Sequence, residues 1–336
     1  MSRLEEAVTR FYEKFRNEAD CFDFIEKMRW PSGFRCPSCD HRFAYRISTR
    51  RVPLFECIHC GNQTSLTSNT IMHKSRTDLS KWLLAIFLVS TLPNSITAVR
   101  LSAVIGVTYK TAWRMLHEIR KTISEVDEHI RLSGQIEAKH EIFMSDLFMT
   151  EFRMAKEKSV IIARENPADR LPRYKIKLIA RNQQARVPLT EEDAYAFVLE
   201  HCSADLTSFA LDPRHQFNTI LSVHDQGSSQ FVPRNPRNKL ITVVTSIPSS
   251  KQQAANANVN QSLSQVAVEG FRWLNASFNG LGIKYAQHYL DEYCFRINHA
   301  MLPTDEVFGT LLAYTLKNYN GLSHKPDIIH SIPISA

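Results

Sequence analysis

The stretch CPSC at residues 36–39 and its counterpart CIHC at residues 57–60 constrain the fold more than any other part of this chain. Seventeen residues, 40–56, separate them, so the pattern is C-x2-C, a loop and C-x2-C. Each C-x-x-C turn offers two thiolates, and a loop of this length forms a hairpin that returns the second pair to the first. The spacing predicts a zinc ribbon over residues 31–72 that holds one structural Zn²⁺. The predicted ligands are Cys36, Cys39, Cys57 and Cys60.

The composition is that of a multi-domain globular protein. The chain has 336 residues, of which 43% are hydrophobic and 22% charged. Its longest apolar run, residues 82–89, is far too short to span a bilayer, so we expect a cytoplasmic protein without a membrane partner. The remaining cysteines are Cys21, Cys202 and Cys294, and their scattered positions agree with a reducing compartment.

The positive charge lies in the N-terminal part. Residues 1–135 hold 20 lysines and arginines against 14 acids, so they carry +6 of the net charge of +7. A positive field of this kind favours a polyanionic partner, and double-stranded DNA is the partner we expect.

Short helices are predicted before the ribbon, within residues 1–30, and a longer helical region is predicted after it. The pattern predicts an apolar helix over 81–90, a second over 95–104 and a third over 109–123. A turn at residues 106–108 joins the last two, which is the layout of a helix-turn-helix domain over 74–132. The third helix is then the recognition helix. Its candidate DNA-contacting residues are Tyr109, Lys110, Thr111 and Arg114.

The rest of the chain mixes strands and helices. Strands are predicted at 136–144, 159–164 and 174–180, followed by a helix at 191–201 and a fourth strand at 206–211. Three strands, a helix and a strand, with acids at strand ends, are how a ribonuclease-H-like sheet begins. The fold class expected for the whole chain is α+β and multi-domain. The ribbon and helix-turn-helix precede a ribonuclease-H-like mixed α/β domain over 134–316 and a loose tail over 317–336.

In this order of elements the chain resembles the bacterial insertion-sequence DDE transposases that carry an N-terminal zinc ribbon. The resemblance covers about residues 20–312. It is strongest at TYKTAWRM (residues 108–115) and at YLDEYCFRIN (residues 289–298). It implies a DNA-binding protein whose relatives work as multimers. It also implies a centre in which three acidic side chains hold two divalent ions, Mg²⁺ by preference, for phosphoryl transfer.

Matching the family's acidic positions residue by residue gives an incomplete centre. Lys139 stands where the family has its first aspartate, in IEAKHE (residues 136–141), whereas Asp212 and Glu269 match the second and third acids. An ammonium repels a metal cation rather than coordinating it. Glu137, Glu141 or Asp146 are possible substitutes. Glu137 and Glu141 share the strand face of Lys139, because side chains alternate along a strand.

Three functions remain open at this point. The first is an active DDE transposase that uses Mg²⁺ for DNA cleavage and strand transfer. The second is a transposase-family protein that binds element-end or regulatory DNA through a degenerate centre, which Lys139 favours. The third is a zinc-containing interaction scaffold, which the N-terminal charge disfavours.

Overall fold

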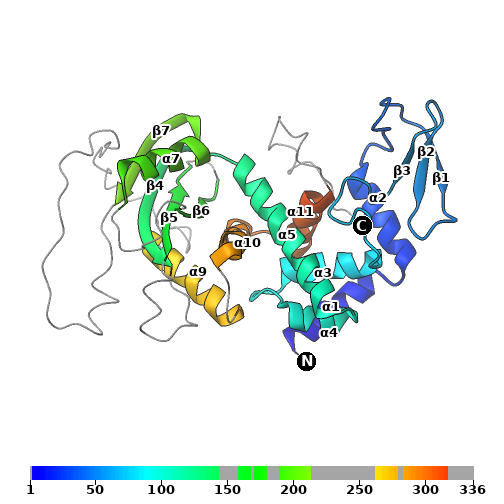
Figure 1. Ribbon diagram of the computed structural model, residues 1–336, viewed down its shortest axis with the longest axis horizontal. Helices are drawn as coiled ribbons and strands as arrows, with labels where there is room; N and C mark the ends of the chain where they lie inside the picture. The colour runs from blue at the N-terminus through cyan, green and yellow to red at the C-terminus, as the bar shows by residue number, and fades with distance from the viewer. Residues whose placement is uncertain are drawn as a thin grey trace, which may run out of the picture. The chain divides into compact units, whose positions relative to one another are not determined.

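The computed structural model describes residues 2–143, 158–167, 170–179, 189–212, 262–278 and 283–316. The chain divides into two compact units. The first comprises Met1–Val126 together with Met301–Ala336, and the second comprises Asp127–Ala300. The boundary falls inside one helix, α5 (Tyr109–His129) (Figure 1). The observed class is mixed α/β. The tail expected at 317–336 lies outside the described residues.

The first unit combines helices with a small antiparallel sheet. Its helices besides α5 are α1 (Arg3–Lys14), α2 (Glu18–Arg29), α3 (Leu79–Thr91), α4 (Ala98–Ile105) and α11 (Thr304–Leu316). Its strands are β1 (Ala44–Ile47), β2 (Leu54–Cys57) and β3 (Gln63–Ser65), which pair in that order. Capping boxes at Ser2 and Asn17 begin α1 and α2, so both N-termini are encoded locally.

Helix α3 is the centre of the first unit's helical part. It is apolar around most of its circumference, and Trp82 and the seven residues that follow it are all buried. Asp78 occupies its N-cap but makes no side-chain cap hydrogen bond. Instead, Glu18 of α2 accepts hydrogen bonds from the backbone N–H groups of Leu79 (2.7 Å) and Ser80 (3.2 Å). A carboxylate from another helix thus supplies the cap that these N–H groups need.

Helix α11 closes the aromatic core of the first unit. Phe308 is completely buried, and its ring stacks on Phe24 with centroids 5.9 Å apart. Phe87 approaches the same ring edge-on at 5.2 Å, and Phe15 at 6.4 Å. Helix α11 is not predicted in the sequence analysis, which includes its residues in the domain over 134–316 together with the preceding sheet. Its apolar face instead packs on α3, which explains why the unit is discontinuous along the chain.

The second unit is a four-stranded sheet with helices on both faces. Its strands are β4 (Leu132–Phe143), β5 (Lys158–Glu165), β6 (Arg173–Leu178) and β7 (Cys202–Asp212), and its helices are α7 (Glu191–His201), α9 (Leu263–Ser277) and α10 (Ala286–Asn298). The spatial order is β6-β5-β4-β7. Strand β4 pairs antiparallel with β5 and parallel with β7, as the alternation of strand, helix and strand predicts.

The two faces of the sheet bury different helices. On one face, Ile136 and Ala138 of β4 belong to a core with Phe197 of α7. On the other face, Phe143 belongs to a core with residues of α9 and α10, and its ring lies 5.2 Å from that of Phe271. The period-two alternation of β4 therefore sends its odd-numbered residues toward α9 and α10.

Helix α10 also protects the edge strand β6. The Asn298 amide donates to the carbonyl of Tyr174 and accepts from its N–H, and Gln287 does the same for the carbonyl of Ile176 and the N–H of Leu178. These amides replace the pairing that a neighbouring strand would provide, so this edge is closed to further strand addition.

Phe308→Ala tests the discontinuous first unit. Because the ring is fully buried among Phe15, Phe24 and Phe87, its removal should lower the free energy of unfolding by ~3–5 kcal/mol. Urea unfolding followed by tryptophan fluorescence measures this loss. The control is Met301→Ala, whose side chain is 61% exposed and should change stability by less than about 0.5 kcal/mol. Equal stabilities of the two variants would contradict the packing of α11 in this core.

Candidate metal centre and nucleic-acid interface

The two cysteine pairs form turns of the same geometry. In the first, the N–H of Asp40 donates to the carbonyl of Cys36 at 2.9 Å, and in the second Gly61 donates to Cys57 at 2.9 Å. The residue after each pair adopts a left-handed conformation, with φ of 61° at Asp40 and 66° at Gly61. Asp and Gly are among the residues that adopt this region most readily, so both turns are encoded in the sequence.

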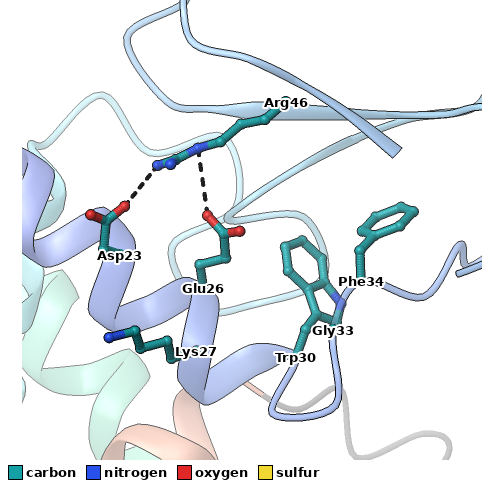
Figure 2. A pocket seen from close by; sticks show the side chains of 7 residues that line it. All are labelled: Asp23, Glu26, Lys27, Trp30, Gly33, Phe34 and Arg46. Carbon is teal, nitrogen blue, oxygen red and sulfur yellow. Dashed lines mark hydrogen bonds and ion pairs between the residues drawn. The ribbon is translucent and has the colours of Figure 1, made fainter. Parts of the chain in front are cut away.

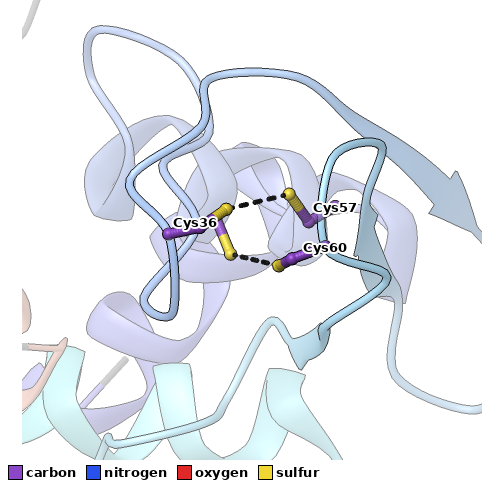
Figure 3. A group of neighbouring side chains, drawn as sticks. Cys36, Cys57 and Cys60 are labelled. Atoms are coloured by element: carbon purple, nitrogen blue, oxygen red, sulfur yellow. Dashed lines mark hydrogen bonds between the residues drawn. The ribbon is translucent and has the colours of Figure 1, made fainter.

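The four sulfur atoms converge on one point. The Sγ atoms of Cys36 and Cys60 lie 3.6 Å apart, as do those of Cys39 and Cys57 (Figure 3). All four lie within 4.8 Å of one another. A zinc ion with four Zn–S bonds of ~2.3 Å at tetrahedral angles places its sulfurs about 3.8 Å apart. The cluster therefore fits a structural Zn²⁺, which confirms the predicted ligand set.

The environment of Cys36 favours a thiolate. Burial opposes its ionisation, but the backbone N–H groups of Ser38 and Cys39 donate to its sulfur. Together with the thiols of Cys60 and Cys39, they lower the pKa of Cys36 to about 7. Zinc binds the thiolate and not the thiol, so these donors support metal binding near neutral pH.

The ribbon is anchored to α2 by two arginines. The guanidinium of Arg29 donates to the carbonyls of Ser65 (2.9 Å), Leu66 (2.5 Å) and Ser68 (2.6 Å), beyond the last strand of the ribbon. Arg46 of β1 reaches back to Asp23 at 2.9 Å and Glu26 at 3.5 Å. Helix α2 and the ribbon therefore form one structural module.

A shallow pocket lies where α2 meets the ribbon. Its volume is about 380 Å³ and Figure 2 shows the side chains around it. Asp23 and Glu26 are already bound by Arg46 there, and Trp30 packs edge-on against Phe34 with centroids 5.1 Å apart. The two carboxylates and the guanidinium of this pocket are thus used to hold the module together.

The predicted DNA-contacting residues lie at the start of α5. Gly106 ends α4 in a left-handed conformation, and Thr108 accepts a hydrogen bond from the N–H of Thr111 at 3.2 Å. Tyr109, with 57% of its surface accessible, is exposed, and so are Lys110 and Arg114. Thr111 is half-buried, and its hydroxyl lies 2.9 Å from that of Thr108. Three of the four candidates thus face solvent, whereas Thr111 serves the start of the helix.

The register of β4 and β7 brings two of the family's acidic positions together. Lys139 of β4 lies directly opposite Asp212, the last residue of β7. The ammonium of Lys139 contacts the hydroxyl of Ser264 on α9 and lies 3.5 Å from the carboxylate of Glu141. Sequence reasoning missed Ser264, because nothing in the sequence indicates which helix residue reaches a lysine 125 positions earlier.

Two of the three possible substitutes for the first acid are engaged by cations, and the third, Asp146, lies outside the described residues. The carboxylate of Glu137 accepts a hydrogen bond from Arg164 at 2.6 Å. Glu141 is buried beside Lys139. Among the described side chains, which do not include that of Asp212, the four cysteines form the one group of three or more potential ligands that converge. The described side chains of this face therefore do not by themselves bring three carboxylates together.

Glu269, the third family position, lies on α9. It is half-buried, and Gln265 one turn earlier donates to it at 3.5 Å. The next residue, Gly270, permits close packing of α9 on α10, since a Cβ there would lie 2.8 Å from the ring of Tyr293. Burial, with smaller contributions from Cys294 and Glu269, raises the pKa of Tyr293. Glu269 thus lies near Tyr293. The residue of α9 that Lys139 contacts is Ser264.

Comparisons with known proteins agree with the metal centre. Residues 16–63 match the family model described as a transposase zinc-ribbon domain, so the matched region includes α2 as well as the ribbon. Over 124 residues the chain is 29% identical to an uncharacterized protein in transposable element ISH50 of Halobacterium salinarum. This segment is 37% of the chain and 41% of that relative, so the chain spans less than half the relative's length. No solved structure matches the chain.

These matches support a transposase-family protein with a structural zinc ribbon. Among the described residues, the helices are too short or too polar to cross a membrane.

Cys36→Ser tests the metal centre. Because loss of one thiolate leaves three protein ligands for the ion, zinc should fall from one equivalent per purified chain to well below one. Elemental analysis measures this content. Cys202→Ser, which changes a cysteine of the second unit, should keep the full equivalent. Full zinc occupancy in Cys36→Ser would rule out the assigned coordination.

Proposed function

We propose that this chain is a transposase-family protein that binds double-stranded DNA and whose catalytic centre is degenerate. The pairing of Lys139 with Asp212 across β4 and β7 carries this proposal. Carboxyl ends of neighbouring parallel strands are where a sheet of this topology assembles its site, and here one of the two residues is a cation. The DNA would be the ends of an element or a regulatory site.

Helices α3, α4 and α5 are proposed to form a helix-turn-helix. The three residues between α4 and α5 and the left-handed Gly106 support this assignment. The start of α5 presents Tyr109, Lys110 and Arg114 to solvent, where recognition helices meet base edges and phosphates. Within the described part of the chain, the side chains of Lys110 and Arg114 make no recorded hydrogen bond or ion pair. Their charge is therefore available to DNA.

The second unit is proposed to be ribonuclease-H-like. In support, strands β4, β5 and β6 form an antiparallel meander and β7 returns parallel to β4 after helix α7. In such a sheet the first acid lies on the opening strand, the position that Lys139 occupies. Among the described residues, Glu137 pairs with Arg164 and Glu141 pairs with Lys139, which supports the loss of the first metal ligand.

Two other functions compete with this one. An active DDE transposase would need a carboxylate at residue 139 or a rearrangement that frees Glu141. A zinc-containing scaffold that binds only protein would not need the exposed cations at the start of α5. Both alternatives lead to different results in the experiments below.

Arg114→Ala tests DNA binding by α5. An arginine contacting phosphate makes a charge-assisted hydrogen bond, so its loss should weaken binding to duplex DNA about tenfold, or ~1.4 kcal/mol. The slope of log affinity against log salt should become shallower by about one. Fluorescence anisotropy over a range of salt concentrations measures both.

Lys121→Ala is the matched control for this variant. Lys121 lies on the same helix and carries the same charge, but it pairs with Glu125 at 3.5 Å. We expect native binding from it. If Arg114→Ala also binds like the native protein, α5 is not the recognition helix.

Lys139→Asp tests the degenerate centre. The native protein should show no nicking of element-end DNA with Mg²⁺ or Mn²⁺, because an ammonium at residue 139 repels the ion. The variant places a carboxylate opposite Asp212, so Mn²⁺ should raise its thermal midpoint more than that of the native protein. Differential scanning calorimetry with and without Mn²⁺ measures this.

Lys139→Met controls for loss of the lysine itself. It removes the charge without adding a ligand, so its midpoint should not respond to Mn²⁺ more than the native one does. The native protein could instead nick DNA in a metal-dependent way, with this activity lost in Asp212→Ala. That result would overturn the proposal of a degenerate centre and indicate an active transposase.

A further inference from the structure

Two basic segments that are distant in sequence meet on the first unit. One is the turn between β1 and β2, which contains Arg50 and Arg51. The other is the segment 73–78 that precedes α3, which contains Lys74 and Arg76. Arg51 joins them, since its guanidinium donates to the carbonyls of Ser75 (2.8 Å) and Arg76 (2.5 Å). We call Arg50, Arg51, Lys74 and Arg76 the basic surface.

The segment that carries Lys74 and Arg76 is held in place by hydrogen bonds. The indole N–H of Trp82 donates to the hydroxyl of Ser75 at 2.9 Å, and the N–H of Thr77 donates to the same hydroxyl at 3.1 Å. Lys74 itself has a left-handed backbone with φ of 56°. The N–H of Ser75 closes this turn on the carbonyl of Met72 at 3.1 Å. The positions of the cations are therefore set before any partner arrives.

The charge of the basic surface is largely uncompensated. All four residues are exposed. The recorded acidic neighbour within the described residues is Asp78, which lies 3.4 Å from Arg51 and 3.9 Å from Lys81. Neither a hydrogen bond nor an ion pair is recorded there for the side chains of Arg50, Lys74 or Arg76. Four cations on two adjoining segments repel one another, and a polyanion relieves that repulsion.

We propose that the basic surface is a second DNA-binding site, which contacts backbone phosphates of duplex DNA independently of α5. Exposed arginines and lysines without an apolar pocket match the chemistry of a phosphate backbone, which is recognised by charge and not by sequence. The ribbon then contributes affinity and orientation, and α5 contributes sequence reading. This inference rests on the proposed DNA-binding function and adds a separate surface to it.

The test is a triple variant, Arg50→Gln with Lys74→Gln and Arg76→Gln. Arg51 is left unchanged because it pins the two segments together. In the full chain, affinity for a duplex of arbitrary sequence should fall on the order of tenfold or more, and the salt slope should become shallower by about two to three. Anisotropy titrations across salt concentrations measure both, and zinc content and thermal midpoint check that the variant is folded.

The control has the same net charge but spares the basic surface. It replaces Arg3, Arg16 and Lys27 of the first unit by glutamine, which removes three other exposed cations. Its salt slope should stay close to the native value. Equal changes in both triple variants would mean that only net charge matters, and no change in the first would mean that the basic surface does not touch DNA. Either result overturns the proposal.

Arg114→Ala in the same titrations separates this proposal from the DNA-binding role of α5. If the Arg50/Lys74/Arg76 variant loses DNA binding while Arg114→Ala binds like the native protein, the basic surface binds DNA and α5 does not. The reverse pattern rejects the basic surface alone. A variant that keeps native DNA affinity but loses binding to polyglutamate would assign the surface to an acidic protein instead, which also overturns the proposal.

Discussion

Coordination of one Zn²⁺ by four thiolates is the constraint on which the N-terminal module depends. Three strands of four, four and three residues cannot bury enough apolar surface to be stable alone, so the metal must supply much of the folding free energy. Once the ribbon is formed, Arg29 and Arg46 bind it to α2, and Arg51 binds its turn to the segment before α3. A single metal centre therefore sets the position of cations that lie far from it in sequence.

The second unit depends on the pairing of β4 with both of its neighbours. Parallel pairing with β7 sets Lys139 opposite Asp212, and the odd-numbered face of β4 is covered by α9 and α10. A lysine on such a face must find partners, and it does so at Ser264 and Glu141. The ion pair that stabilises the ammonium of Lys139 also engages the carboxylate of Glu141, which would otherwise be a candidate metal ligand.

The two units support different parts of the proposed function: the first supports DNA binding, and the second supports a degenerate catalytic centre. Residues 16–63 of the first unit match a transposase zinc-ribbon domain, and the unit exposes cations on α5 and on the basic surface. The second unit is proposed to be ribonuclease-H-like, and its strand register sets Lys139 opposite Asp212. Binding without cleavage reconciles these features, because phosphate recognition requires only positive charge, whereas phosphoryl transfer on this sheet requires metal ligands.

The sequence by itself determined the features that depend on local spacing. Cysteine pairs, the left-handed Gly106 and the alternation along β4 follow from neighbouring residues, so the zinc site, helices α3 to α5 and the strands of the second unit were predictable, whereas α11 was not. The cap that Glu18 provides to α3 and the return of Phe308 to the N-terminal core were decided only by tertiary structure. The same is true of the partners of Lys139 and of the basic surface. These contacts join residues whose side chains meet only after the helices and sheets have packed, and no local pattern encodes which distant residue fills a given space.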